Sequence, residues 1–234
     1  MASGLRGIPW YLADWWAYAK LPGAESLSLI ESCPQFHDRT DTTPFDRHYF
    51  FLSGWAMRRI IANRPSRHTD VASLGLFVNM LSAIVPVAFL EFRPLPAKLA
   101  GLEPLAGSML ALPFLDNSIQ SLSCLHAAEH VGLGRYGDSL DPEGTKKAAR
   151  ELVRVLAPSG HLYFAVPIGK QRVCFNAHRV HNPKSIIDYF ADLELREFSA
   201  VCDEGTYCER VSPSLFTNSD NACGLFWFRK RPPE

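Results

Sequence analysis

The chain has 234 residues, of which 47% are hydrophobic and 21% are charged, as in an ordinary globular protein. Lysine plus arginine and aspartate plus glutamate both number 24, so the formal net charge is zero. This balance argues against a broad basic surface for binding nucleic acid, and we expect no nucleic-acid partner. A local basic patch is still compatible with it.

Residues 1–66 are predicted to form an aromatic-rich helical extension. Aromatic side chains gather between Trp10 and Tyr18, and positions 11, 12, 15 and 16 share one helical face. A helix packed on the main domain, a homodimer interface and a lid over a pocket all remain open for it. The chain starts without the pattern of a signal peptide, and its six cysteines form no CxxC pair. We therefore expect a cytoplasmic protein with reduced thiols.

Residues 67–234 alternate short strands with helices, which predicts βαβ units and a mostly parallel sheet flanked by helices. The apolar stretch 71–90 is interrupted by polar residues and proline, so no transmembrane segment is expected. Two final strands close in sequence predict an antiparallel hairpin at one edge. The expected strands are HTDVAS, PVAFLEF, LEPLAGS, IQSLSCLH, HLYFAVP, LELREFSAVCD and ACGLFWFRK.

The helix predicted over 143–156 has the clearest pattern of any element. Ala149, Leu152, Val153 and Leu156 fall at i, i+3, i+4 and i+7. The Pro158-Ser159-Gly160 stretch is expected to end the helix and turn the chain into the next strand. Further helices are expected over 49–62, 75–84 and 183–190. In such α/β sheets, ligands bind just beyond the carboxyl ends of the strands.

The run LPFLDNSIQSL…EH…ELVRVLAPSGHLYFAVP resembles class I methyltransferases that use S-adenosylmethionine. Their pattern there is LPF-x-D-x-S-F-D, a Glu-His step and R-V-L-K-P-G-G. The strings EHVGLGRYGDSLDPEG and VPIGKQRVCFNAHRV are similar to one narrower family, domain of unknown function 268, over about residues 68–200. The resemblance implies a Rossmann-like methyltransferase sheet and S-adenosylmethionine as the cofactor.

The resemblance also implies where the cofactor contacts lie. The family turn D-x-G-x-G-x-G corresponds to 70–76, where Ala72, Leu74 and Leu76 replace the expected glycines. A degenerate turn that binds nothing is the alternative there. Glu91 corresponds to the acid that accepts hydrogen bonds from the ribose hydroxyls. The complete implied set of cofactor contacts is Asp70, Ala72, Ser73, Gly75, Glu91, Ser108, Met109 and Leu125.

The segment 126–130 carries the sharpest chemical signal. If it is helical, His126, Glu129 and His130 share one face and could hold one divalent metal ion. This step is similar to the Glu-x-x-Glu-His step of metal-dependent O-methyltransferases, a resemblance that implies His178 as a further ligand. Without a metal, His130 or His126 could act as the general base, and both readings stay open.

The glycine-rich segment 132–138 follows, and it predicts a loop beside the acceptor pocket. Arg135 and Asp138 are candidate acceptor contacts, and Tyr136 could stack on a ring. Structural ion pairing is an equal alternative for Arg135 and Arg179. The complete set of candidate substrate contacts is Arg135, Tyr136, Asp138, Asn176, His178 and Arg179.

The function expected from these features is methyl transfer from S-adenosylmethionine to an oxygen nucleophile. The polar mouth favours a small-molecule or glycan acceptor, namely a sugar hydroxyl or another small polyol. A catalytically silent methyltransferase-like protein that serves in binding or assembly is the alternative. A nicotinamide oxidoreductase would also suit the fold, but the chain lacks a GxGxxG motif.

Overall fold

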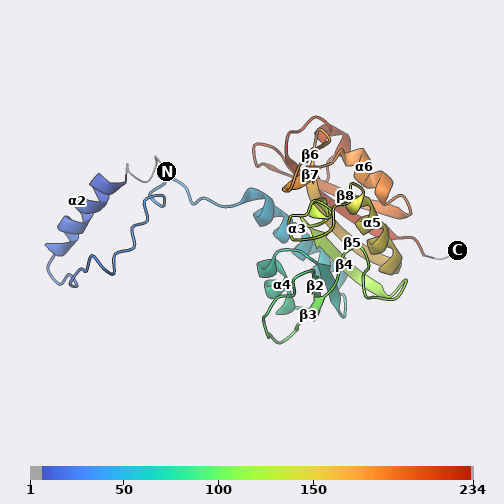
Figure 1. The fold of residues 1–234 in the computed structure, drawn as a ribbon, viewed down its shortest axis with the longest axis horizontal. Helices are drawn as coiled ribbons and strands as arrows, with labels where there is room; N and C mark the ends of the chain where they lie inside the picture. The colour runs from blue at the N-terminus through green and yellow to red at the C-terminus, as the bar shows by residue number, and fades with distance from the viewer. Residues whose placement is uncertain (1–6, 233–234) are drawn as a thin grey trace. The chain divides into compact units, whose positions relative to one another are not determined.

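A computed structural model describes residues 7–232 and divides the chain into two compact units, Met1–Phe45 and Asp46–Glu234 (Figure 1). The first unit contains helix α2 (Ile8–Ala19), which confirms the predicted helix. The rings of Trp10 and Tyr11 meet Phe36 edge to face, with centroids 6.3 and 5.7 Å apart. The aromatic residues thus form a small local cluster, while Trp16 stays 64% exposed.

The boundary between the units lies at residue 45, whereas the sequence placed it at 66. Helix α3 (Arg47–Asn63) belongs to the second unit, because it buries Leu52, Trp55 and Ile60 against strands of the sheet. Asp46 begins this helix by accepting a hydrogen bond from the backbone N–H of Tyr49 at 3.0 Å. The apolar face of α3 is therefore part of the core of the second unit.

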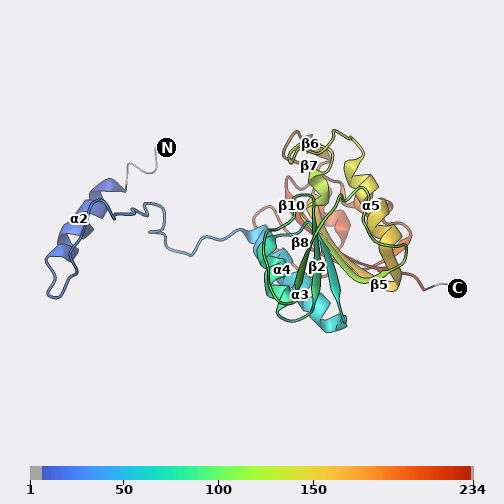
Figure 2. The same ribbon diagram turned by 60° about the horizontal axis from the view of Figure 1, so that its bottom comes forward.

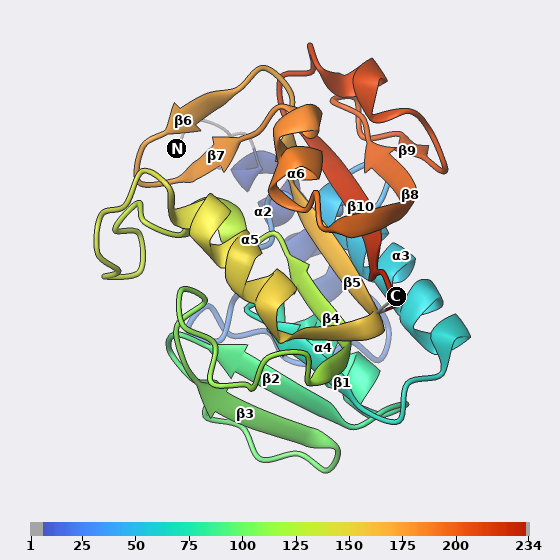
Figure 3. The ribbon, with the colours of Figure 1, turned by 90° about the vertical axis from the view of Figure 1, so that its right-hand side faces the viewer.

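The second unit is built on an eight-stranded sheet with the order β3-β2-β1-β4-β5-β10-β8-β9 (Figure 3). The first five strands in this order run parallel, and β10 pairs antiparallel with both β5 and β8. The predicted Rossmann-like sheet with an antiparallel edge is thus confirmed. The strands are β1 (His68–Val71), β2 (Val87–Glu91), β3 (Leu102–Ala106), β4 (Ile119–Leu125), β5 (Leu156–Ile168), β8 (Leu193–Val201), β9 (Tyr207–Cys208) and β10 (Ala222–Lys230).

Helices cover both faces of this sheet (Figure 2). Helices α3 and α4 (Gly75–Ser82) pack on one face, where Trp55 and Phe77 are fully buried. Helices α5 (Gly144–Val155) and α6 (Pro183–Tyr189) pack on the other, where Leu152 and Ile186 are fully buried. Within residues 7–232, no helix has both the length and the apolar character needed to span a membrane.

Local structure departs from the sequence prediction in two places. Helix α5 ends at Val155 and β5 begins at once, so the predicted turn 158–160 lies within a strand. Ser159 adopts a φ of 62° there, and the pairing of β4 with β5 shifts register nearby. A two-stranded hairpin of β6 (Arg172–Cys174) and β7 (His178–Val180) was not predicted. Two short 3₁₀ turns, η1 (Ala128–His130) and η2 (Pro213–Phe216), complete the unit.

Candidate functional site

A pocket of about 830 Å³, counting the open space at its mouth, lies at the carboxyl ends of β1, β2, β3 and β4. Strand order reverses at β1, so this is where doubly wound sheets bind ligands. Strand ends and the loops after them bring together residues that the sequence placed in separate motifs. Eight predicted site residues line the pocket: Ala72, Glu91, Ser108, Met109, His126, His130, Tyr136 and Asp138.

Asp70 and Ser73 shape the turn after β1, and neither lines the pocket. Asp70 is fully buried and accepts hydrogen bonds from the Ser73 backbone and hydroxyl and from the Ser123 hydroxyl. Burial raises the pKa of Asp70 to about 6. The Ser73 hydroxyl also accepts from the backbone N–H of Leu125 at 3.0 Å, so it joins the turn to the end of β4. Asp70, Ser73 and Leu125 therefore hold the backbone next to the pocket without lining it.

The turn after β1 reaches the pocket although the expected glycines are missing. Ala72 lines the pocket and adopts a φ of 60°, the left-handed conformation that glycine takes without strain. Leu74 and Leu76 are 41% and 60% exposed and do not line the pocket. Gly75 begins α4, and a Cβ added there would meet open space. The replaced glycines thus leave the pocket unfilled.

Glu91 ends β2 at the pocket wall, where the sequence predicted a ribose acceptor. Partial burial raises the pKa of its carboxyl, while the backbone N–H groups of Arg93 and Phe92 act in the opposite direction. Ser108 and Met109 follow β3 on the neighbouring part of the wall. An acid and a polar–apolar pair therefore line adjacent parts of one pocket.

The segment 126–130 is not the regular helix on which the shared-face hypothesis depended. His126 adopts a φ of 54° and lies before η1, so His126, Glu129 and His130 do not share one face of a regular helix. Glu129 instead lies between the two histidines, with Oε1 3.5 Å from His126 Nδ1 and 3.7 Å from His130 Nε2. Both Glu129 oxygens are buried without a hydrogen-bond partner among the described residues. Burial raises the pKa of Glu129 to about 8 and lowers that of His126 to about 3.

The predicted metal ligands do not fit a single ion as they are arranged. Within residues 7–232, one group of three His, Cys, Asp or Glu side chains has ligand atoms all within 4.8 Å of one another. That group is His48, His126 and Cys223, and the sequence reasoning missed two of its members. The predicted set of His126, Glu129, His130 and His178 is not gathered in this way.

His130 lines the pocket through a neutral imidazole ring. Its Nδ1 lies 2.6 Å from the Ala177 carbonyl oxygen, to which it donates, so Nε2 carries the lone pair. Burial lowers the pKa of His130 to about 4. The imidazole is therefore neutral near pH 7.

The glycine-rich loop forms one side of the pocket mouth. Gly132, Gly134 and Gly137 all have positive φ. Asp138 accepts from the backbone N–H of Gly132 at 2.6 Å and therefore holds the loop in shape. Two guanidinium groups lie over the Tyr136 ring, with Arg93 Cζ 4.8 Å and Arg135 Cζ 5.2 Å from the ring centroid.

The remaining predicted substrate contacts do not line this pocket. Arg179 is buried and donates to the carbonyl oxygens of Val131 and Asp141 at 2.5 and 2.8 Å, so it fastens the loop to β7. Asn176 turns the β6–β7 hairpin with a φ of 61°. His178 pairs with Cys174 in that hairpin and does not line the pocket.

Solved structures with this fold include S-adenosylmethionine-dependent methyltransferases. The N-methyltransferase NodS of Bradyrhizobium japonicum, in complex with S-adenosyl-L-homocysteine, matches with a TM-score of 0.55 and 17% identity, covering 83% of this chain and 90% of that chain. A chain of the Haloferax volcanii complex between the Trm112 methyltransferase activator and a candidate methyltransferase matches with a TM-score of 0.57 and 16% identity, covering 81% and 92%. The [4+2]-cyclase SpnF also matches, with a TM-score of 0.55 and 14% identity, covering 78% and 81%. The protein thus has the class I methyltransferase fold.

Residues 115–200 match a family model, described as Caenorhabditis protein of unknown function, DUF268. This match confirms the narrower resemblance that the glycine-rich and FNAHRV strings predicted. The sequence matches none of the curated proteins.

Proposed function

We propose that the chain is an S-adenosylmethionine-dependent methyltransferase that binds its cofactor in the pocket at the carboxyl ends of β1, β2 and β3. The observation that carries the proposal is the place of Glu91, whose carboxylate ends β2 at the pocket wall. A carboxylate only accepts hydrogen bonds and therefore suits the two hydroxyls of a ribose. Ser108 and Met109 would then flank the adenine, and the turn at Ala72 would approach the amino acid portion of the cofactor.

The acceptor is an oxygen nucleophile, for which we propose a hydroxyl of a sugar or another small polyol. Its oxygen forms a new bond to the sulfonium methyl carbon as the carbon–sulfur bond breaks. The products are a methyl ether and S-adenosylhomocysteine, whose sulfur is uncharged. His130 Nε2 takes the hydroxyl proton, since its ring is neutral and lines the pocket. Tyr136 and Arg135 at the mouth would contact the acceptor.

A catalytically silent binding protein is the second candidate, favoured by Leu74 and Leu76 in place of glycines. Exposed apolar side chains of the N-terminal unit, Trp16 at 64% and Ile30 at 97%, would then serve association, including a homodimer through α2. The cyclase among the structural matches illustrates that the fold alone does not fix the activity.

Calorimetric titration with S-adenosylmethionine and S-adenosylhomocysteine separates the two candidates. We expect saturable binding, weakened roughly 10-fold or more in Glu91→Gln, because a hydrogen bond to a charged group contributes about 1.5–3 kcal/mol. Glu103→Gln is the matched control, since Glu103 lies exposed on the neighbouring β3 and pairs with Arg67. The enzyme proposal fails if the unaltered protein binds neither compound at millimolar concentration.

A further inference from the structure

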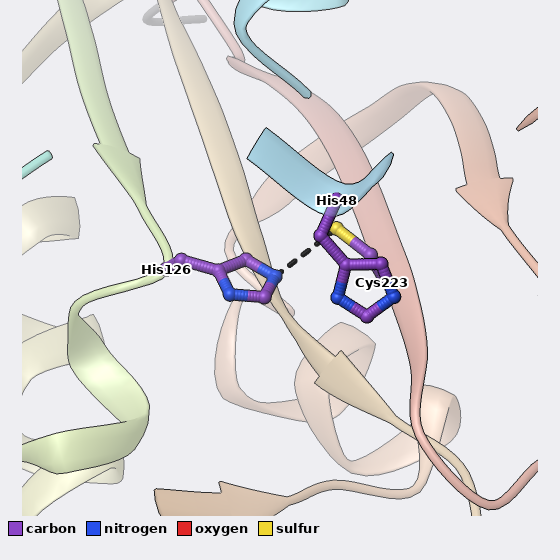
Figure 4. A group of neighbouring side chains, drawn as sticks. All are labelled: His48, His126 and Cys223. Carbon is purple, nitrogen blue, oxygen red and sulfur yellow. Dashed lines mark hydrogen bonds between the residues drawn. The ribbon is translucent and has the colours of Figure 1, made fainter. Parts of the chain in front are cut away.

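Three side chains from distant parts of the second unit meet beside the pocket (Figure 4). His48 lies in the first turn of α3, His126 follows β4, and Cys223 is the second residue of β10. One ligand atom from each lies within 4.8 Å of the others. His126 Nε2 and Cys223 Sγ are already 3.1 Å apart.

Two imidazoles and a thiolate are the donors that a zinc ion prefers. Zinc binds histidine nitrogen and cysteine sulfur at about 2.0–2.3 Å with tetrahedral geometry, which places ligand atoms roughly 3.3–3.8 Å apart. The three ligand atoms lie within 4.8 Å of one another, so binding an ion requires the side chains to move somewhat closer together around it. Zinc binds histidine through an unprotonated ring nitrogen, and each of the two histidines offers one ring nitrogen to the group.

Glu129 supplies an independent observation that points to a cation. Its carboxylate is fully buried, and neither oxygen has a hydrogen-bond partner among the described residues. Ionising a carboxyl group in such a place costs several kcal/mol unless a nearby cation compensates the charge. Its Oε1 lies 3.5 Å from His126 Nδ1, the ring nitrogen that does not face Cys223. Histidines that bind metals commonly donate this second N–H to a carboxylate.

We propose that His48, His126 and Cys223 bind one zinc ion and that Glu129 orients His126 by accepting a hydrogen bond from its Nδ1–H. When the ion binds, the Cys223 thiol proton and the proton held by the buried Glu129 carboxyl both leave to solvent. One dication, one thiolate and one carboxylate then sum to zero charge in a buried place. The fourth zinc position stays open for water or a ligand, and the ion borders the pocket because His126 lines it.

The site differs from the metal site that the sequence suggested, with which it shares only His126 as a ligand. It also stands apart from the methyltransferase proposal, because nothing in it depends on S-adenosylmethionine. Its test is therefore metal binding by the full chain without any methyl donor.

The experiment titrates chelator-stripped protein with Zn²⁺ against a chromophoric competitor, and with Co²⁺ followed by absorption spectroscopy. We expect one ion per chain and a thiolate-to-cobalt charge-transfer band. Cys223→Ser should abolish the band, and His48→Gln should weaken zinc binding at least 100-fold. Glu129→Gln should keep the band but weaken binding roughly 10- to 100-fold. Cys124→Ser is the matched control, since Cys124 is equally buried but outside the group and should bind like the unaltered chain.

His130→Gln separates this site from the alternative set, because His130 belongs only to the latter. Its zinc affinity should equal that of the unaltered chain. The proposal is overturned if zinc does not bind at one ion per chain, or if Cys223→Ser retains the cobalt band. Loss of binding in His130→Gln but not in His48→Gln would also overturn it. His48 is only partly buried, so its variant keeps the test decisive even if Cys223→Ser does not fold.

Discussion

Ser73 donates both its backbone N–H and its hydroxyl to the two carboxylate oxygens of Asp70, at 3.0 and 2.7 Å. These bonds close the turn after β1 around Ala72, whose φ is 60°. A left-handed conformation costs a residue with a Cβ roughly 1–2 kcal/mol. The paired hydrogen bonds of Asp70 offset this cost, so the turn does not depend on glycine.

Ala72→Gly should stabilise the protein, because it removes the strain of the left-handed conformation. We expect the free energy of unfolding in urea to rise by about 0.5–1 kcal/mol, the strain relieved less the added chain entropy. Ala83→Gly is the control, since Ala83 ends α4 with a φ of −73° and should lose up to about 1 kcal/mol. Equal losses in both variants would contradict the strain at Ala72.

Arg59→Met should be strongly destabilising. Arg59 Nη2 lies 2.7 Å from Glu197 Oε1, both residues are 8% exposed, and Trp55 Nε1 donates to the same oxygen. Removing Arg59 leaves the buried Glu197 carboxylate with the exposed Arg210, at 3.4 Å, as its remaining cation. We expect a loss near the lower end of roughly 3–5 kcal/mol in chemical denaturation. Lys184→Met breaks the exposed pair with Asp188 and should cost less than about 1 kcal/mol. The prediction fails if the two variants lose equal stability.

His68 should make the protein less stable in acid. Its ring is fully buried between the Ser121 and Ser123 hydroxyls, and burial lowers its pKa to about 3 from an ordinary 6.5. Below pH 6.5 His68 is protonated in the unfolded chain, whereas its ring in the folded protein stays neutral until the pH approaches 3. The stabilisation present above pH 6.5 is therefore lost as the pH falls toward 3.

The measurement compares His68→Asn with the unaltered chain by urea unfolding in chelator at pH 7.5 and 4.5. Between pH 7.5 and 4.5, the unaltered chain should lose on the order of 2 kcal/mol more stability than His68→Asn loses. A difference that stays constant between the two pH values would show that His68 titrates alike in both states.

Tyr136→Ala should weaken binding of S-adenosylhomocysteine, given the proposed cofactor pocket. The ring joins Arg93, which follows β2, to Arg135 of the glycine-rich loop, and each guanidinium contact contributes about 0.5–1 kcal/mol. We expect affinity to fall roughly 3- to 30-fold in calorimetry, whereas Tyr136→Phe should stay within about 3-fold. Undiminished binding by the alanine variant would mean that this contact does not support the pocket.

The sheet and its main helices were predictable because their apolar periodicity is local. Helix α5 illustrates this, since Ala149 and Leu152 lie on the buried face that their spacing predicted. The prediction of a turn at 158–160 was wrong, because it followed the usual rule that proline and glycine mark turns between helices and strands. Here β5 passes through it with a left-handed Ser159. The β6–β7 hairpin is too short and too polar for periodicity to reveal.

The pocket was predictable in part, because residues that end parallel strands meet at one edge of the sheet. Glu91 and Ser108 were found in this way and both line the pocket. His48 and Cys223 were not found, because only the packing of α3 on the sheet and the pairing of β10 with β5 bring them to His126. No spacing of residues along the sequence indicates that His48, His126 and Cys223 lie close together.

The place of β10 between β5 and β8 bears on how the chain acquires its structure during synthesis. Until Ala222–Lys230 leaves the ribosome, the nascent β5 and β8 both present unpaired backbone groups on the edges that β10 later joins. Lys230 then donates to the carbonyl oxygens of Val153 and Leu156, which fastens the end of α5 last. A nascent chain that stalls before Ala222 is thus an open sheet prone to pair with its neighbours, and the order of the strands delays the completed fold until β10 has been made.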